Sequence, residues 1–278
     1  MLPPKTFDRD LIARRLQRRP PDAEDFVMRL VLDDLAERLL VVTRRFEQAA
    51  ILSPDASQLP LRGNTRDGSF AFERISTVLD SSIDPERLTL PRTGYDLIVS
   101  LFDVQVVNDV VGFFTRVRQH LAPDGLLIAA AIGGDSLFEL RHAFLSAEAR
   151  TGGAFARVAP FIPLADAGGL LQRAGLALPV TDIESHMVRY ASPFALMQEI
   201  RALGASNPLA DRPGRLMTPG LLAAAAAAYA DEFSDPDGRI RATLEIIWMS
   251  GWAPDDSQQK PLKPGSAQVS LKDVLGRS

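Results

Sequence analysis

The sequence predicts an α/β protein built on a mostly parallel sheet, and three observations lead to that fold class. Short apolar runs typical of buried strands alternate with longer segments of helical periodicity. Turn sequences such as Pro123-Asp124-Gly125 separate them. Near the C-terminus, two strand-like segments are expected to pair antiparallel at a sheet edge. Strand, helix and strand in this order form a parallel unit, because the crossover helix returns the chain to the same end of the sheet.

Residues 5–46 are expected to form two helices. Apolar residues from Phe7 to Ile12 begin one face, Pro20-Pro21 interrupts it, and the helical pattern resumes from Phe26 to Val42. The paired arginines of the first helix are typical of a solvated face, and a docking patch for an acidic partner is the alternative. We assign residues 1–48 to N-terminal helices packed on the core and residues 49–278 to one α/β domain.

The core of that domain is predicted from three buried runs and one alternating run. The strands are expected at 49–52, 70–79, 95–100 and 126–132, with a helix at 110–121 between the last two.

A helix is expected after the fourth strand, with Ser136 as its N-cap and Glu139 at the capping-box spacing. Residues 152–163 are expected to form a linker or lid-like loop. Further helices are predicted at 166–174, 192–204 and 218–233, and late strands at 185–190 and 243–252. These segments give a helical insertion at about 191–238 and a C-terminal strap at 253–278, which either packs over the sheet or forms a groove lip with Trp252.

Composition excludes several classes of function. The net charge of −4 disfavours general binding to a nucleic-acid backbone, which needs concentrated Lys and Arg. The absence of cysteine excludes disulfides and thiolate chemistry, and it suits the cytoplasm, where we expect the protein. No secretory signal and no membrane span are predicted, since the apolar run Leu221–Ala230 is too short to cross a bilayer. The three histidines have no ligand spacing, so no metal site is expected.

Several stretches resemble one protein family over nearly the whole chain. The strand YDLIVS at 95–100 and the segment LAPDGLLI at 121–128 look like a class I S-adenosylmethionine-dependent methyltransferase. The stretches at 158–182, 189–207 and 235–267, with FDRDLIARRLQRR at 7–19, resemble the methyltransferase-like assembly factor of respiratory complex I and its bacterial relatives. The methyltransferase that masks a malonyl carrier in biotin synthesis is a more distant relative. The resemblance implies a Rossmann-like sheet and S-adenosylmethionine as cofactor.

The chain departs from the family where the cofactor is expected. Leu52 is followed by Ser53-Pro54-Asp55, so the Asp/Glu-x-Gly-x-Gly signature is absent and Pro54 offers no N–H donor. Ile51 and Tyr95 are 44 positions apart, which is too few for three complete crossovers, so at least one helix or strand is missing on this side. Gln105-Val106 replaces the His-Trp pair that the family usually has before Val-Asn-Asp.

The resemblance implies five candidate site residues at the carboxyl ends of strands. Ser53 and Asp55 are expected to line the methionine side, Asp80 matches the acid that such proteins turn towards adenine, and Ser100 closes the pocket. Asp135 is the candidate catalytic base. Four of the five have a structural alternative: Ser53, Asp55 and Asp80 suit plain turns, and Asp135 suits the start of the next helix.

Two functions follow. The first is S-adenosylmethionine-dependent methyl transfer to an unknown small-molecule or protein acceptor, linked to complex I assembly. The alternative is a non-catalytic, degenerate homologue that binds a protein partner. Relatives are also linked to arginine hydroxylation on a complex I subunit, which the sequence leaves open.

Overall fold

A seven-stranded sheet forms the centre of the molecule in the computed structural model, which describes residues 5–20, 23–84, 86–149, 155–212 and 217–259. The strand order is β2-β3-β1-β4-β5-β7-β6. Neighbours from β3 to β5 run parallel, whereas β2, β7 and β6 join antiparallel. This mixed sheet confirms the α/β, Rossmann-like fold class. The strands are β1 Ala49–Ser53, β2 Arg62–Thr65, β3 Gly68–Ser76, β4 Tyr95–Leu101, β5 Leu121–Ile132, β6 Ala177–Tyr190 and β7 Ile240–Trp252.

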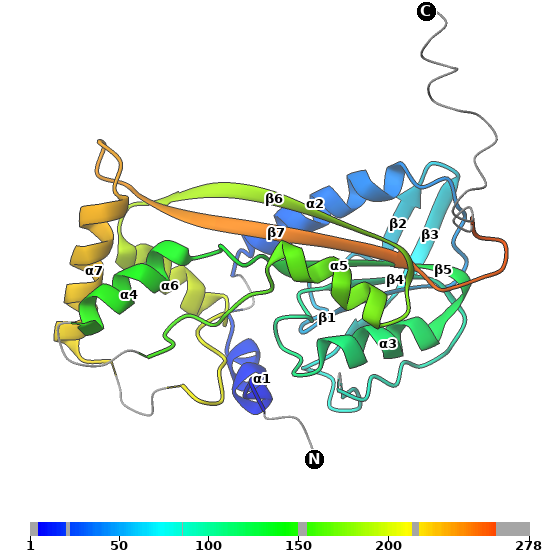
Figure 1. Ribbon diagram of the computed structural model, residues 1–278, viewed down its shortest axis with the longest axis horizontal. Helices are drawn as coiled ribbons and strands as arrows, with labels where there is room; N and C mark the ends of the chain where they lie inside the picture. The colour runs from blue at the N-terminus through cyan, green and yellow to red at the C-terminus, as the bar shows by residue number, and fades with distance from the viewer. Residues whose placement is uncertain (1–4, 21–22, 85, 150–154, 213–216, 260–278) are drawn as a thin grey trace, which may run out of the picture.

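Helices cover both faces of the sheet and one end of it (Figure 1). The helices α3 and α5 pack on one face, and α2 packs on the other. The helices α4, α6 and α7 form a group at the far end of the long β6–β7 pair, with their own apolar core. None of the described helices is both long and apolar enough to cross a membrane. The helices are α1 Arg9–Gln17, α2 Phe26–Leu40, α3 Val110–His120, α4 Phe138–Ala149, α5 Leu164–Arg173, α6 Pro193–Ala202 and α7 Pro219–Phe233.

The segment between β1 and β4 is shortened, as the spacing predicts. Its described residues form the β2–β3 hairpin and loops, but no helix. The hairpin turns at Thr65–Gly68 and places the antiparallel strand β2 at the sheet edge. A parallel strand there would need a long crossover, and the chain is too short to provide it.

The predicted capping box at Ser136 and Glu139 is wrong. The helix α4 begins at Phe138, so neither residue takes its capping position. The Ser136 hydroxyl accepts a bond from the amide of Glu245 at 2.9 Å, and the Glu139 carboxylate accepts one from the amide of Thr243 at 2.9 Å. Both side chains therefore connect α4 to β7. The donors lie more than 100 positions away in the chain, so the local spacing of Ser136 and Glu139 could not reveal them.

The alanine-rich helix packs as predicted. Ala225 of α7 is buried, and Ala224 and Ala228 are partly buried, in the core that this helix shares with Leu140 and Ala143 of α4. Small side chains allow this close approach. The helix α7 begins with Thr218 as N-cap and Pro219 in its first turn, as the sequence indicates.

Trp252 does not form a groove lip at the carboxyl ends of the parallel strands. It pairs with Leu126 in the first half of β5, and the guanidinium of Arg44 lies 4.8 Å from the centre of its ring. Trp252 therefore lies towards the amino ends of the parallel strands, away from their carboxyl ends. Residues 253–259 continue there, where Gln258 donates to the Asp124 carboxylate at 2.8 Å, and the rest of the strap lies outside the described residues.

Candidate functional site at the carboxyl ends of the strands

A cavity of about 280 Å³ lies beyond the carboxyl ends of β1, β4 and β5. Chain order reverses at β1, which lies between β3 and β4, and such a switch point is where open α/β sheets bind ligands. Ser53 and Asp55 line this cavity. The other walls come from α1, the first turn of α2, α6, and residues 157–161 of the predicted lid-like loop. Residues 152–154 of that loop lie outside the described chain.

A buried carboxylate connects the ends of β3 and β4. Asp103 is fully buried, and it accepts bonds from the hydroxyls of Thr77 at 2.5 Å and Ser100 at 2.7 Å. Burial raises the pKa of Asp103 to about 6, against the opposing effect of the two hydroxyl bonds and the Arg9 charge. Ser100 therefore serves this internal network, and it is not among the cavity-lining residues.

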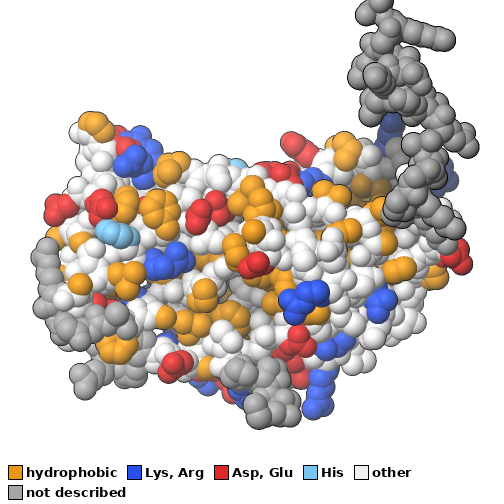
Figure 2. All heavy atoms as spheres, in the orientation of Figure 1, with side chains coloured by type: hydrophobic (Ala, Val, Ile, Leu, Met, Phe, Trp, Pro, Cys, Tyr) orange, Lys and Arg blue, Asp and Glu red, His pale blue; other side chains and the backbone are white. Residues whose placement is uncertain are grey.

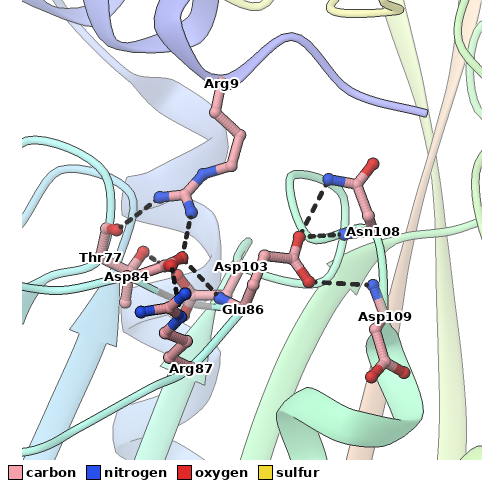
Figure 3. Close-up of polar contacts among 8 residues, drawn as sticks. All are labelled: Arg9, Thr77, Asp84, Glu86, Arg87, Asp103, Asn108 and Asp109. Carbon is pink, nitrogen blue, oxygen red and sulfur yellow. Dashed lines mark hydrogen bonds and ion pairs between the residues drawn. The ribbon is translucent and has the colours of Figure 1, made fainter. Parts of the chain in front are cut away.

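The N-terminal segment covers the same strand ends (Figure 3). The Arg9 guanidinium forms an ion pair with Asp84 at 2.7 Å and donates to the Thr77 carbonyl at 3.2 Å. The Asn108 side chain accepts from the amides of Thr6 at 2.6 Å and Phe7 at 2.9 Å.

A second acid fixes the segment that follows β4. The Glu86 carboxylate accepts from the backbone and side-chain nitrogens of Asn108, at 2.6 and 3.0 Å, and from the amide of Asp109 (Figure 3). The Asp109 carboxylate caps α3 by accepting from the amide of Gly112 at 2.8 Å. The Asn108-Asp109 pair thus links the N-terminal segment, the loop that contains Glu86, and α3.

The turn after β1 uses most of its polar groups internally. The carbonyls of Ser53 and Pro54 accept from the amides of Thr77, Val78 and Leu79. The amide of Ala56 donates to the Ser76 hydroxyl at 2.9 Å, and the amide of Ser57 donates to the Asp55 carboxylate at 2.9 Å.

These strand ends offer S-adenosylmethionine few free polar groups. Its methionine carboxylate needs free N–H donors after β1, but Pro54 has none, and the amides of Ala56 and Ser57 are already bonded. Its ribose needs an acceptor at the end of β3, where Ser76 and Thr77 stand and Arg9 covers the Thr77 carbonyl.

The sequence-predicted site residues are only partly brought together. Ser53 is buried and Asp55 half-buried, side by side at the cavity. Asp80 is exposed in a turn, where bonds from the hydroxyl and amide of Ser82 lower its pKa. Asp135 is exposed, with its amide bonded to Glu245 at 2.9 Å. Neither Asp80 nor Asp135 is among the residues that line the cavity.

Sequence reasoning missed Asp103, Thr77 and Arg9. Asp103 had a detectable signal, because it is a lone acid between apolar residues directly after a buried strand. Arg9 had no such sequence signal, because Thr77 and Asp84, which it contacts, are 68 and 75 positions away in the chain. In the part of the chain that the structure describes, no group of three or more His, Cys, Asp or Glu residues could hold a metal ion.

Solved structures with similar architecture are distant in sequence. The YcgJ protein of Bacillus subtilis superposes with a TM-score of 0.46 and 13% identity, over 82% of this chain and 99% of that one. A putative methyltransferase from Bacillus halodurans gives a TM-score of 0.43 and 11% identity, over 81% of this chain and 98% of that one. No family model matches the chain.

Relatives among characterised proteins are closer. The zebrafish arginine-hydroxylase NDUFAF5, mitochondrial, is 37% identical over 192 residues, which are 69% of this chain but 60% of that protein. The chain therefore spans less than two thirds of that relative. A malonyl-[acyl-carrier protein] O-methyltransferase of Halorhodospira halophila is 31% identical over 70% of this chain and 64% of its own length. The human arginine-hydroxylase NDUFAF5 is 32% identical over 286 residues, which are 96% of this chain and 83% of the human protein. This chain belongs to the NDUFAF5 family of methyltransferase-like proteins.

Proposed function

We propose that this chain acts in the assembly of respiratory complex I by binding a partner polypeptide, and that it does so without S-adenosylmethionine. Membership of the NDUFAF5 family supports the link to complex I. The relatives are named arginine-hydroxylases, and this name supports an arginine as the partner residue that the chain recognises. The cytoplasm is the compartment that we propose.

One observation carries the cofactor-free role. The polar groups that face a ligand at the ends of β1 and β3 are hydrogen-bonded to one another, and Arg9 adds its own bond to the Thr77 carbonyl. A cofactor would have to break these bonds before it could form its own, so its binding would gain little net free energy.

Calorimetric titration of S-adenosylmethionine and S-adenosylhomocysteine into the purified chain tests the cofactor-free role. We expect no binding heat at several temperatures. The variant Asp80→Ala should then behave as the wild type does, because its carboxylate bonds only within an exposed turn in the residues described. Affinity in the micromolar range, about −8 kcal/mol, would overturn the proposal, and loss of that affinity in Asp80→Ala would assign Asp80 to adenine.

The partner-binding role has its own test. A tagged copy of the chain, expressed in its native host and purified under mild conditions, should retain a complex I subunit at stoichiometric level. Recovery of the chain alone, after chemical crosslinking as well, would contradict that role.

A second candidate function is methyl transfer, and the placement of Ser53 and Asp55 at the cavity favours it. In that reaction a nucleophile on the acceptor would displace the methyl group from the sulfonium, with Asp135 as the candidate base. A positive titration of S-adenosylmethionine would move the function to this candidate, and Asp135→Asn would then test the base.

A further inference from the structure

The cavity at the strand ends has mainly apolar walls from parts of the chain far apart in sequence. Figure 2 shows apolar side chains gathered around the middle of one face, between the helical group at the left and the strands at the right. The first wall is the strand ends, the second is α1, and the third is α6 with the 157–161 loop. The apolar residues of these walls include Phe102 and Ile132, then Ile12 and Leu16, then Leu196 and Phe161.

Each charged side chain that lines the cavity already has a partner inside the protein. The Arg19–Asp25 ion pair has an N–O distance of 3.1 Å, and both side chains are almost fully buried. The other pairs are Arg157 with Glu148 at 2.7 Å, Asp55 with the amide of Ser57 at 2.9 Å, and Glu199 with the hydroxyl of Tyr190. An anionic ligand would have to break the ion pair of Arg19 or Arg157 or remain uncompensated, and a cationic ligand would have to lose its hydration among mainly apolar walls, so both are costly.

We propose that this cavity binds an uncharged, apolar small molecule, such as a hydrocarbon chain or ring. The volume of about 280 Å³ is at the lower limit of small-molecule pockets, which span roughly 300–1,000 Å³. An apolar guest gains free energy by covering the exposed walls and asks for no hydrogen bond. This site is separate in chemistry from the partner-binding role proposed above.

A peptide segment is a poorer guest than an apolar small molecule. It would bring backbone N–H and C=O groups into the cavity, and each would need a partner there. The charged groups of the walls are engaged in the pairs described above. The mainly apolar walls offer few groups for this, so a peptide gains less from the site than a guest without polar groups.

The test uses N-phenyl-1-naphthylamine, an uncharged dye whose fluorescence rises in apolar surroundings. We expect saturable binding to the wild-type chain at one site. Leu16→Trp, which places a larger side chain at the wall formed by α1, should weaken dye binding at least tenfold. Leu61→Trp is the matched control, because Leu61 is 63% exposed and does not line the cavity, and it should bind as the wild type does.

A second matched pair keeps the test valid if Leu16→Trp fails to fold. Val106 lines the cavity and is 7% exposed, whereas Val41 is 77% exposed and does not line it. Val106→Trp should weaken dye binding at least tenfold, and Val41→Trp should leave it unchanged. Thermal unfolding of all four variants identifies any that are unfolded.

Displacement of the bound dye tests the ligand class. Decanol should displace it at concentrations at least tenfold lower than decanoate or decylamine. Absence of saturable binding, equal weakening in the control variants, or stronger displacement by either charged analogue would overturn the proposal. Stronger displacement by an apolar peptide than by decanol would overturn it in favour of a protein guest.

Discussion

The two halves of the central sheet differ in the groups that lie beyond the ends of their strands. On the side of β1, β3 and β4, polar groups face one another and bond internally, with Arg9 and Asp103 as the charged members. Beyond the ends of β5 and β7, the walls are mainly apolar, and the cavity of about 280 Å³ extends from there to Ser53 and Asp55 at the end of β1. The same fold thus provides a closed polar end and an open apolar end.

This difference shows which part of the molecule has a cavity large enough for a ligand. The closed end coincides with the shortened segment between β1 and β4, which has no helix in its described residues. The open end coincides with the helical insertion and the loop that Glu148 and Arg157 hold in place. The two regions meet at α1, which carries both Arg9 and Ile12, and after β4, where Phe102 of the cavity precedes Asp103 of the polar network.

The largest effect is expected at the open end, from Glu148→Ala. Glu148 is 2% exposed and bonds both Arg157, at 2.7 Å, and the amide of Phe155, at 2.9 Å. Its removal leaves a largely buried guanidinium without this carboxylate, so we expect a loss of about 3 kcal/mol in the free energy of unfolding. Urea unfolding measures this loss. Glu232→Ala, which removes the exposed partner of His142, is the control and should lose less than about 0.5 kcal/mol. A loss below about 1 kcal/mol in Glu148→Ala would show that the loop is held by other contacts.

The next effect is a pH dependence at the closed end. The pKa of Asp103, about 6, is above the ordinary value near 3.8, so the folded state favours its protonated form. This contribution to stability is fully present below about pH 4 and is lost as the pH rises through about 6. Between those limits it changes by up to about 3 kcal/mol.

Asp103→Asn isolates this contribution, because the amide does not titrate. Unfolding free energies of both proteins, measured at about pH 4 and about pH 7, should show the wild type losing more stability than Asp103→Asn as the pH rises. Parallel pH profiles for the two proteins would contradict the assignment of a raised pKa to this carboxyl.

The smallest effect is expected from Arg9→Ala, also at the closed end. The substitution removes one partly exposed ion pair and one bond to the Thr77 carbonyl, which together contribute about 1 kcal/mol. Amide hydrogen exchange should accelerate in residues 6–17, because this segment would lose its anchor to the strand ends. Arg87→Ala is the control, since Arg87 is 87% exposed and 3.9 Å from Asp84. Unchanged exchange in Arg9→Ala would mean that the bonds to Asn108 suffice to hold the segment.

Periodicity predicted the elements better than it predicted their contacts. The helices starting at Thr218-Pro219 and Ser192-Pro193 carry local signals and are confirmed, with both N-caps formed. The strand pair β6–β7 is confirmed and is longer than predicted, since β6 begins at Ala177 and β7 at Ile240. Ser136 and Glu139 had the spacing of a capping box, but the partner strand β7 took both side chains.

The sequence by itself determined the α/β fold, the order of its elements and the loss of the glycine-rich turn, because these depend on local residue types and on chain length. It also placed Ser53 and Asp55 at the end of the first strand. Only the tertiary structure decided that Arg9 covers the ends of β3 and β4, that Ser100 bonds Asp103, and that an apolar cavity lies beside them. These features join residues far apart in the chain, and burial and hydrogen bonding between such residues are set by packing, which no local pattern records.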